Sequence, residues 1–187
     1  MGFENILFFL AIFVGFYMAW SIGANDVANA MGTSVGSKAL SFKKAILVAA
    51  VFEFAGAFLL GGNVSDTIRS KILVNSEALS MDSMVLVKGM LAALVGSAAW
   101  IHVATILGLP VSSTHAIIGS VMGFGIYQSG FGAVQWDQVG FIALSWVTSP
   151  LLGALIGFSI FIFIRNKILD SKTPLKNFVQ FSPYLMF

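Results

Sequence analysis

Apolar residues fill four stretches of the chain, with few charged positions inside them. Each stretch approaches the roughly 20 residues that a helix needs to cross a hydrocarbon core about 30 Å thick. The pattern therefore predicts four membrane-spanning helices, over residues 3–22, 44–62, 84–104 and 139–164.

Two further apolar segments are interrupted by polar residues. One is residues 27–36, expected as a short helix that follows a break at Asn25 and Asp26. The other, residues 105–127, is expected as two half-helices joined by an irregular turn. Irregular backbone at bilayer depth must be buried in protein or line a cavity, and paired interruptions of this kind point to a transporter binding site. The interruptions in the second segment are Gly108, Pro110, Ser112, Ser113, Thr114 and His115.

Basic residues between the spans predict the orientation of the chain. Lysines gather in residues 38–44 and basic residues gather again in 165–176, whereas 128–138 contains none. Basic connections favour the cytoplasmic side. If 105–127 crosses once as a broken unit, the chain has five crossings, an outside N-terminus and a cytoplasmic tail.

The last residues turn apolar again, so a further span is expected to start there. This divides the chain into a membrane domain (1–165), a cytoplasmic linker (166–177) and the start of a truncated span (178–187). An odd number of crossings suits an inverted repeat, because the following half then inserts upside down. We therefore expect the chain to be a fragment, or one half of a protein whose second half is separate.

Composition supports an all-α, multi-pass protein of the cell membrane. Of the 187 residues 58% are hydrophobic and only 10% are charged, which places the chain in a lipid bilayer. The few basic residues follow topology, so nucleic acid binding has no support. The chain has no cysteine, so disulfides and thiolate metal sites are excluded. It shows neither a nucleophile elbow nor a phosphate-binding loop ending in Gly-Lys, and we expect no enzyme activity.

Two polar motifs resemble the signatures of a known family. The first runs Gly23-Ala-Asn-Asp-Val-Ala-Asn-Ala30 and continues through Gly32-Thr-Ser-Val-Gly36, and the second is Pro110-Val-Ser-Ser-Thr-His-Ala116. Together they resemble the inorganic phosphate transporter (PiT) family, the sodium- or proton-coupled phosphate permeases. The resemblance covers nearly the whole chain in the order of its spans.

Members of that family carry such a motif pair in each of two inverted halves, and this chain shows one pair. The resemblance therefore implies the N-terminal half of an inverted-repeat transporter. It implies inorganic phosphate as substrate, Na⁺ or H⁺ as the co-transported ion, and a second half or a homo-oligomer as partner. No cofactor is expected beside the co-transported Na⁺.

The residues also predict an anion site without reference to the family. A dehydrated phosphate is best met by backbone N–H groups at helix N-termini, where the helix dipole favours an anion. Both interrupted segments are expected to offer such a start, with Asp26 as the N-cap of helix 27–36. Hydroxyl groups can donate to phosphate oxygens as well. The predicted phosphate-binding residues are Asp26, Asn29, Ser112, Ser113, Thr114 and His115.

A cation is expected beside the anion. A carboxylate at bilayer depth costs on the order of 2.5–3.5 kcal/mol, so Asp26 needs an ion, a partner or water. It would repel phosphate unless a cation lies between them or a phosphate proton points at it. Asn25 and Asn29 can share a helical face and supply, with Asp26, hard oxygen ligands for Na⁺. Glu53 is a further cation ligand or the partner of a buried basic group. Mutual charge compensation would then produce symport.

Several of these residues have structural alternatives. The Ser112 hydroxyl could bond its own backbone, and Asn29 could link two helices. His115 could contact phosphate, relay a proton or satisfy a carbonyl. Titration of Asp26, Glu53 or His115 would favour H⁺ over Na⁺ as the coupled ion. The alternative functions are a passive anion channel and a half-length subunit that is inactive without its second half.

Overall fold

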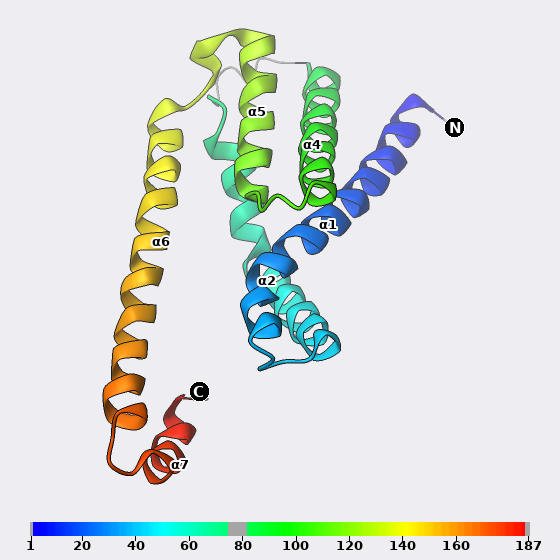
Figure 1. Cartoon of the computed structure of the whole chain (residues 1–187). Coiled ribbons are helices and arrows are strands. Elements are labelled where there is room, and N and C mark those ends of the chain that lie inside the picture. The colour runs from blue at the N-terminus through cyan, green and yellow to red at the C-terminus, as the bar shows by residue number, and fades with distance from the viewer. Residues whose placement is uncertain (1, 75–81, 186–187) are drawn as a thin grey trace. The chain divides into compact units, whose positions relative to one another are not determined.

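The computed structural model describes residues 2–74 and 82–185, and most of these residues are helical. In this described part, α1, α2, α4 and α6 are long and apolar enough to cross a membrane (Figure 1). The helices are α1 (Phe3–Gly36), α2 (Phe42–Lys71), α4 (Ser83–Ile106), α5 (Ser113–Ser129), α6 (Trp136–Ile164) and α7 (Pro174–Leu185), with a 3₁₀ turn at Phe131–Ala133 and a π-helical turn at Arg165–Leu169.

The four spans predicted from apolar run length are confirmed as helices. Residues 3–22 lie in α1, 44–62 in α2, 84–104 in α4 and 139–164 in α6. Each helix extends beyond the predicted range because polar and small residues at the ends of an apolar run can continue the helix into the interface. The prediction of an all-α membrane protein is therefore confirmed.

Helix α1 corrects one prediction, because it continues without interruption through Asn25 and Asp26 to Gly36. The predicted break and the separate helix 27–36 are wrong, and so is Asp26 as an N-cap. Asparagine and aspartate disrupt helices when their side chains bond the local backbone, but here both side chains bond residues of other elements. Figure 1 shows that α1 bends while it remains helical. Ser21 donates to the Tyr17 carbonyl at 2.9 Å, a contact that often accompanies helix bending.

Helices α4 and α5 form an antiparallel hairpin, and residues 107–112 form the irregular turn at its tip (Figure 1). The predicted irregular turn is confirmed. The prediction of two half-helices is wrong, because α4 continues through Ile106 and α5 is a single helix. The 17 residues of α5 are about 26 Å long, slightly less than a hydrocarbon core. The count of five crossings therefore stays a prediction.

An apolar core lies beneath the tip of this hairpin. Met18 of α1 packs with Ala98 and Ile101 of α4, and all three side chains are buried. Half-buried residues of the turn and of the first turns of α5, among them Val111 and Ala116, cover this core. The core fixes which faces of α1, α4 and α5 meet, and it thereby sets the position of the polar residues beside it.

The chain divides into two compact units, Met1–Gln138 and Val139–Phe187. In the second unit α7 packs against the end of α6: the rings of Phe163 and Phe181 meet edge to face at 5.6 Å, and Asn177 Nδ2 donates to the Lys167 carbonyl at 2.7 Å. Helix α7 begins within the segment predicted as a linker, and the division at 166–177 and 178–187 stays a prediction.

Candidate functional site

The turn between α4 and α5 begins with a well-defined helix end. Gly108 adopts a left-handed conformation with φ of 68°. Its N–H donates to the Thr105 carbonyl at 3.1 Å, and the Leu109 N–H donates to the Ala104 carbonyl at 2.8 Å. This bond pair is a Schellman motif, which favours glycine at the left-handed position and proline shortly after it. Pro110 follows, so the sequence Gly-Leu-Pro ends α4 at this point.

Asn25 joins the turn to the middle of α1. The Asn25 side chain is only 4% exposed. Its Nδ2 donates to Thr105 Oγ1 at 3.0 Å and to the Leu109 carbonyl at 3.1 Å. Its Oδ1 accepts from the Val111 N–H at 3.3 Å and from Asn29 Nδ2 at 3.2 Å. The predicted shared face of the two asparagines is confirmed by this last contact.

Asp26 joins the first polar motif to the start of α5. Ser113 Oγ donates to Asp26 Oδ2 at 3.0 Å, although the two residues are 87 positions apart. Both side chains are half-buried. A carboxylate near a helix N-terminus is stabilised by the helix dipole. The two motifs that sequence analysis singled out therefore meet at one place.

The first turn of α5 provides backbone donors beside Asp26. Ser112 caps the helix by accepting the His115 N–H at 3.3 Å. The N–H groups of Ser113 and Thr114 lie in the first turn, where no helical carbonyl can reach them. Thr114 and His115 have exposed side chains. Of the two polar motifs, both within the described residues, the second alone lies at a helix start, because the amides of the first bond within the continuous α1.

Glu53 stands apart from this cluster. It lies in the middle of α2 with an exposed side chain. Among the described residues, no hydrogen bond or ion pair connects Glu53 with Asn25 or Asp26. Its role as a cation ligand stays a prediction.

Thr105 is a member of the cluster that sequence analysis did not identify. Its hydroxyl donates to the Ile101 carbonyl at 2.7 Å and accepts from Asn25. The sequence does indicate this role, because Thr105 follows Ile101 by one helical turn and precedes Gly108 by three residues. Ile101 is buried, so Thr105 lies on the same buried face. A hydroxyl on the buried face of a helix, next to a helix end, is well placed to bond a neighbouring element.

A cation at this site would meet oxygen ligands of mixed type. Across the described residues, no group of three or more histidine, aspartate or glutamate side chains is placed to hold a metal ion. The Asp26 carboxylate, the Asn29 amide and nearby hydroxyls remain, and hard oxygen ligands suit an ion such as Na⁺ better than a transition metal.

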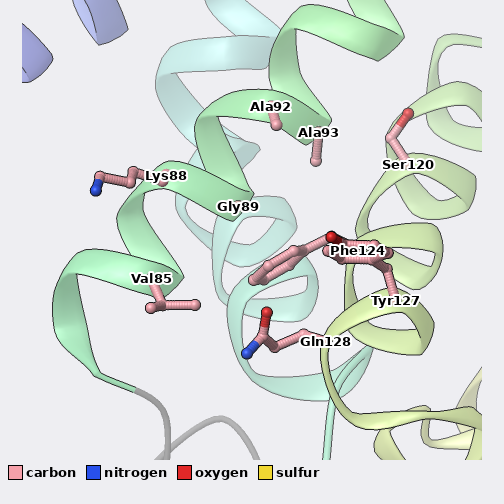
Figure 2. A pocket seen from close by; sticks show the side chains of 9 residues that line it. All are labelled: Val85, Lys88, Gly89, Ala92, Ala93, Ser120, Phe124, Tyr127 and Gln128. Atoms are coloured by element: carbon pink, nitrogen blue, oxygen red, sulfur yellow. The ribbon is translucent and has the colours of Figure 1, made fainter.

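Two surface cavities lie outside the site. One, of about 510 Å³, opens between α4 and α5 toward the base of the hairpin; Figure 2 shows the Lys88 amino group pointing away from it. Another, of about 680 Å³, lies between α1 and α2. The polar contacts, rather than these apolar hollows, mark the candidate site. The first cavity is lined by Val85, Lys88, Gly89, Ala92, Ala93, Ser120, Phe124, Tyr127 and Gln128, and the second by Gly23, Ala24, Val27, Ala28, Gly32, Val35, Gly36, Phe42, Ala45 and Ile46.

Comparison with known proteins identifies the family to which the chain belongs. The model of the phosphate transporter family matches residues 22–187, a range that includes both polar motifs. The chain belongs to the phosphate transporter family. This membership agrees with the resemblance seen in the motifs, and it makes the chain a multi-pass protein of a transporter family.

Individual members of the phosphate transporter family match most of the chain. "Inorganic phosphate transporter 2-1, chloroplastic" of Arabidopsis thaliana is 44% identical over 183 residues, covering 98% of this chain and 31% of the relative. A solved structure named "The sodium-dependent phosphate transporter" aligns with a TM-score of 0.85 and 43% identity, covering 92% of this chain and 42% of that chain. A relative from Pyrococcus horikoshii is 46% identical over 175 residues, and the match covers 94% of this chain and 43% of that relative. The chain thus spans less than half the length of these relatives.

Proposed function

We propose that this chain forms one half of a secondary transporter that carries inorganic phosphate together with Na⁺. The observation that carries the proposal is the 3.0 Å hydrogen bond from Ser113 Oγ to Asp26 Oδ2, because it joins the two polar motifs beside a helix start. Family membership supports phosphate as substrate. The name of the similar solved structure supports Na⁺ as the coupled ion.

The start of α5 would bind the phosphate. The N–H groups of Ser113 and Thr114 and the positive end of the α5 dipole favour an anion. The hydroxyls of Ser112 and Ser113 can add further donors, because each can rotate toward a ligand. The Asp26 carboxylate lies beside this helix start and accepts a hydrogen bond from Ser113.

Na⁺ binding would change the role of Asp26. A cation that shares the Asp26 carboxylate and the Asn29 amide oxygen neutralises the charge that would otherwise repel phosphate. Phosphate can then compete for the Ser113 hydroxyl that Asp26 now holds. The bound anion in turn stabilises the cation, so each ion raises the affinity for the other by the same factor. Coupled binding of this kind is the physical basis of symport.

A protonated phosphate oxygen would also contact Asp26. A carboxylate can accept a hydrogen bond from HPO₄²⁻ or H₂PO₄⁻, whereas sulfate has no proton to donate at neutral pH. Asp26 would thereby discriminate between two anions of similar size. The site therefore suits phosphate better than sulfate.

Uptake of labelled phosphate into proteoliposomes tests the proposal. The purified chain is reconstituted alone and, in parallel, with a second half taken from a relative. We expect accumulation above the external concentration when an inward Na⁺ gradient is imposed, in at least one of the two preparations. Equilibrium binding of phosphate to the detergent-solubilised chain, with and without Na⁺, provides a readout that needs no vectorial transport.

The controls separate the alternatives. Accumulation driven by a proton gradient alone would replace Na⁺ with H⁺ and overturn the coupling assigned here. Uptake that stops at equal concentrations, whatever gradient is imposed, would identify a passive channel and overturn symport. The absence of phosphate binding in both preparations would overturn the whole proposal.

A further inference from the structure

The side-chain amide of Asn25 has no unused hydrogen-bonding capacity. An asparagine amide carries two N–H donors and an oxygen with two lone pairs. Asn25 uses both donors, on Thr105 and Leu109, and both acceptor sites, from Val111 and Asn29. The donors and acceptors around it also fix its orientation, because a flipped amide would place its NH₂ group against the Val111 N–H. A Na⁺ ion could bind Oδ1 only after one of these bonds broke.

The Thr105 hydroxyl has likewise already used its single donor. Its hydroxyl hydrogen goes to the Ile101 carbonyl at 2.7 Å, which leaves the oxygen to accept from Asn25. With its proton used in this way, Thr105 cannot donate to an anion. Any effect of Thr105 on phosphate must therefore pass through Asn25 and the turn.

The bonds from Asn25 hold the backbone on both sides of Pro110. The Leu109 carbonyl precedes this proline and the Val111 N–H follows it, and both bond the same amide. Pro110 itself has no N–H to anchor. Ser113 begins α5 only two residues after Val111, so the position of its hydroxyl beside Asp26 depends on this anchored stretch.

We infer that Asn25 and Thr105 are positioning residues: they form a clamp, here called the Asn25–Thr105 clamp, that holds residues 107–112 so that α5 starts beside Asp26. This inference rests on the proposed function and changes one part of the sequence prediction, since it removes Asn25 from the cation ligands. Asp26 and Asn29 keep that role. The clamp raises the affinity for both ions by holding the binding geometry ready before either ion arrives.

Two substitutions separate a clamp from a cation ligand. Asn25→Asp keeps an oxygen and adds a charge, so a ligand role would preserve or strengthen Na⁺ binding, whereas the clamp loses both N–H donors. Thr105→Val removes the acceptor without changing any charge. We expect Thr105→Val to weaken Na⁺ and phosphate binding by about tenfold, the scale of one lost hydrogen bond, and Asn25→Asp to weaken both by at least as much, because it loses two. Thr105→Ser keeps the hydroxyl and should remain close to the wild type.

A matched control is available on α2. Thr67 donates to the Asn63 carbonyl at 3.0 Å, in the same way that Thr105 donates to Ile101, but its side chain belongs to a different helix and is outside the cluster. Thr67→Val should leave both affinities unchanged. The double variant Asn25→Asp with Thr105→Val should lose no more than the stronger single variant, because both changes release the same clamp.

A second readout does not depend on phosphate at all. The chain has no cysteine, so Val111→Cys introduces a single thiol at a half-buried position of the turn. We expect a maleimide to modify this thiol several-fold faster when Thr105→Val is added, and no faster when Thr67→Val is added. Faster labelling in a chain that binds no phosphate would support the clamp while the proposed function fails.

The inference is overturned by either of two results. One is Thr105→Val with wild-type affinities and wild-type labelling of the introduced thiol. The other is Asn25→Asp with Na⁺ binding that is retained or tighter, since this is the behaviour of a ligand.

Discussion

The two ends of the α4–α5 hairpin are held in different ways. At the tip, directed hydrogen bonds join the turn to Asn25 and the first residue of α5 to Asp26. At the base, shape holds the helices together: the ring of Phe124 lies against Gly89, where any Cβ would overlap it. Beside the apolar core at the tip, these polar contacts depend on single atoms, whereas the contact between Gly89 and Phe124 at the base is apolar and depends on volume.

From this difference we expect changes at the tip to affect ligand binding and changes at the base to affect the free energy of unfolding. Hydrogen bonds fix a direction and a distance, so the loss of one at the tip should change the geometry offered to a ligand. Close packing fixes how near two helices can come, so a change at the base should be felt mainly in the free energy of unfolding. The four predictions below compare the tip with the base, beginning with the largest expected effect.

Asp26→Asn should abolish Na⁺-dependent phosphate binding. The amide keeps the size of the side chain but removes the charge that Na⁺ neutralises, so the two ions no longer raise each other's affinity. Phosphate binding measured with and without Na⁺ checks this. The matched control Asp137→Asn changes an exposed carboxylate in the first turn of α6 and should retain full Na⁺ dependence. Unchanged Na⁺ dependence in the Asp26 variant would refute its assigned role.

Gly89→Ala should destabilise the chain by about 1–3 kcal/mol relative to Gly96→Ala, because overpacking forces neighbouring groups to move. Both glycines lie in α4, so each substitution brings the same gain in helix propensity. The new Cβ overlaps Phe124 at position 89 but meets Ser120 Oγ at an ordinary 3.7 Å at position 96. Denaturation in detergent measures the difference, and phosphate affinity of the folded fraction should stay the same. Equal stabilities would contradict shape-based packing at the base.

Ser113→Ala should lower phosphate affinity by about tenfold, as expected for one lost hydrogen bond to a charged group. Its thermal unfolding should change little, because α5 keeps its cap, Ser112. Ser83→Ala is the matched control, since Ser83 is the first residue of α4 as Ser113 is of α5, and it lies at the base. A fall in affinity in both variants, measured by calorimetry, would show that the tip has no special role.

Gly108→Ala and Gly130→Ala should each lower stability by about 1 kcal/mol, because a positive φ strains any residue with a Cβ. Both positions have a positive φ, 68° and 80°, and both have open space for a methyl group. Only the change at the tip, at Gly108, should also reduce phosphate affinity, by a few-fold. If Gly130→Ala reduces affinity equally, the tip and the base are not separate in function.

The sequence predicted the parts of the fold that local chemistry determines. Apolar run length is enough to locate a span, because the bilayer sets the length that a helix must cover. The turn at 107–112 was also predictable, since a glycine followed shortly by a proline, here Gly108 and Pro110, is a common helix end. Asn25 and Asn29 were expected on one helical face because they are four residues apart.

The remainder depends on partners that are distant in sequence. The continuity of α1 could not be predicted, because Asn25 bonds residues 80 and 84 positions away rather than its own backbone. Thr105 was overlooked for the same reason, since its importance comes from Asn25. The predicted role of Glu53 rested on depth in a span alone, and depth does not indicate which way a side chain points.

The unbroken α1 limits how the proposed transporter can open its site to either side of the membrane. Helix α1, with 34 residues, is about 51 Å long along its axis, and unwinding it at Asn25 would free backbone groups that then need new partners within the protein. In the transporter proposed above, exchange of ions between the two compartments would then move α1 as one unbroken helix. Because Asn25 and Asp26 of α1 bond the tip of the α4–α5 hairpin, the tip would move together with α1.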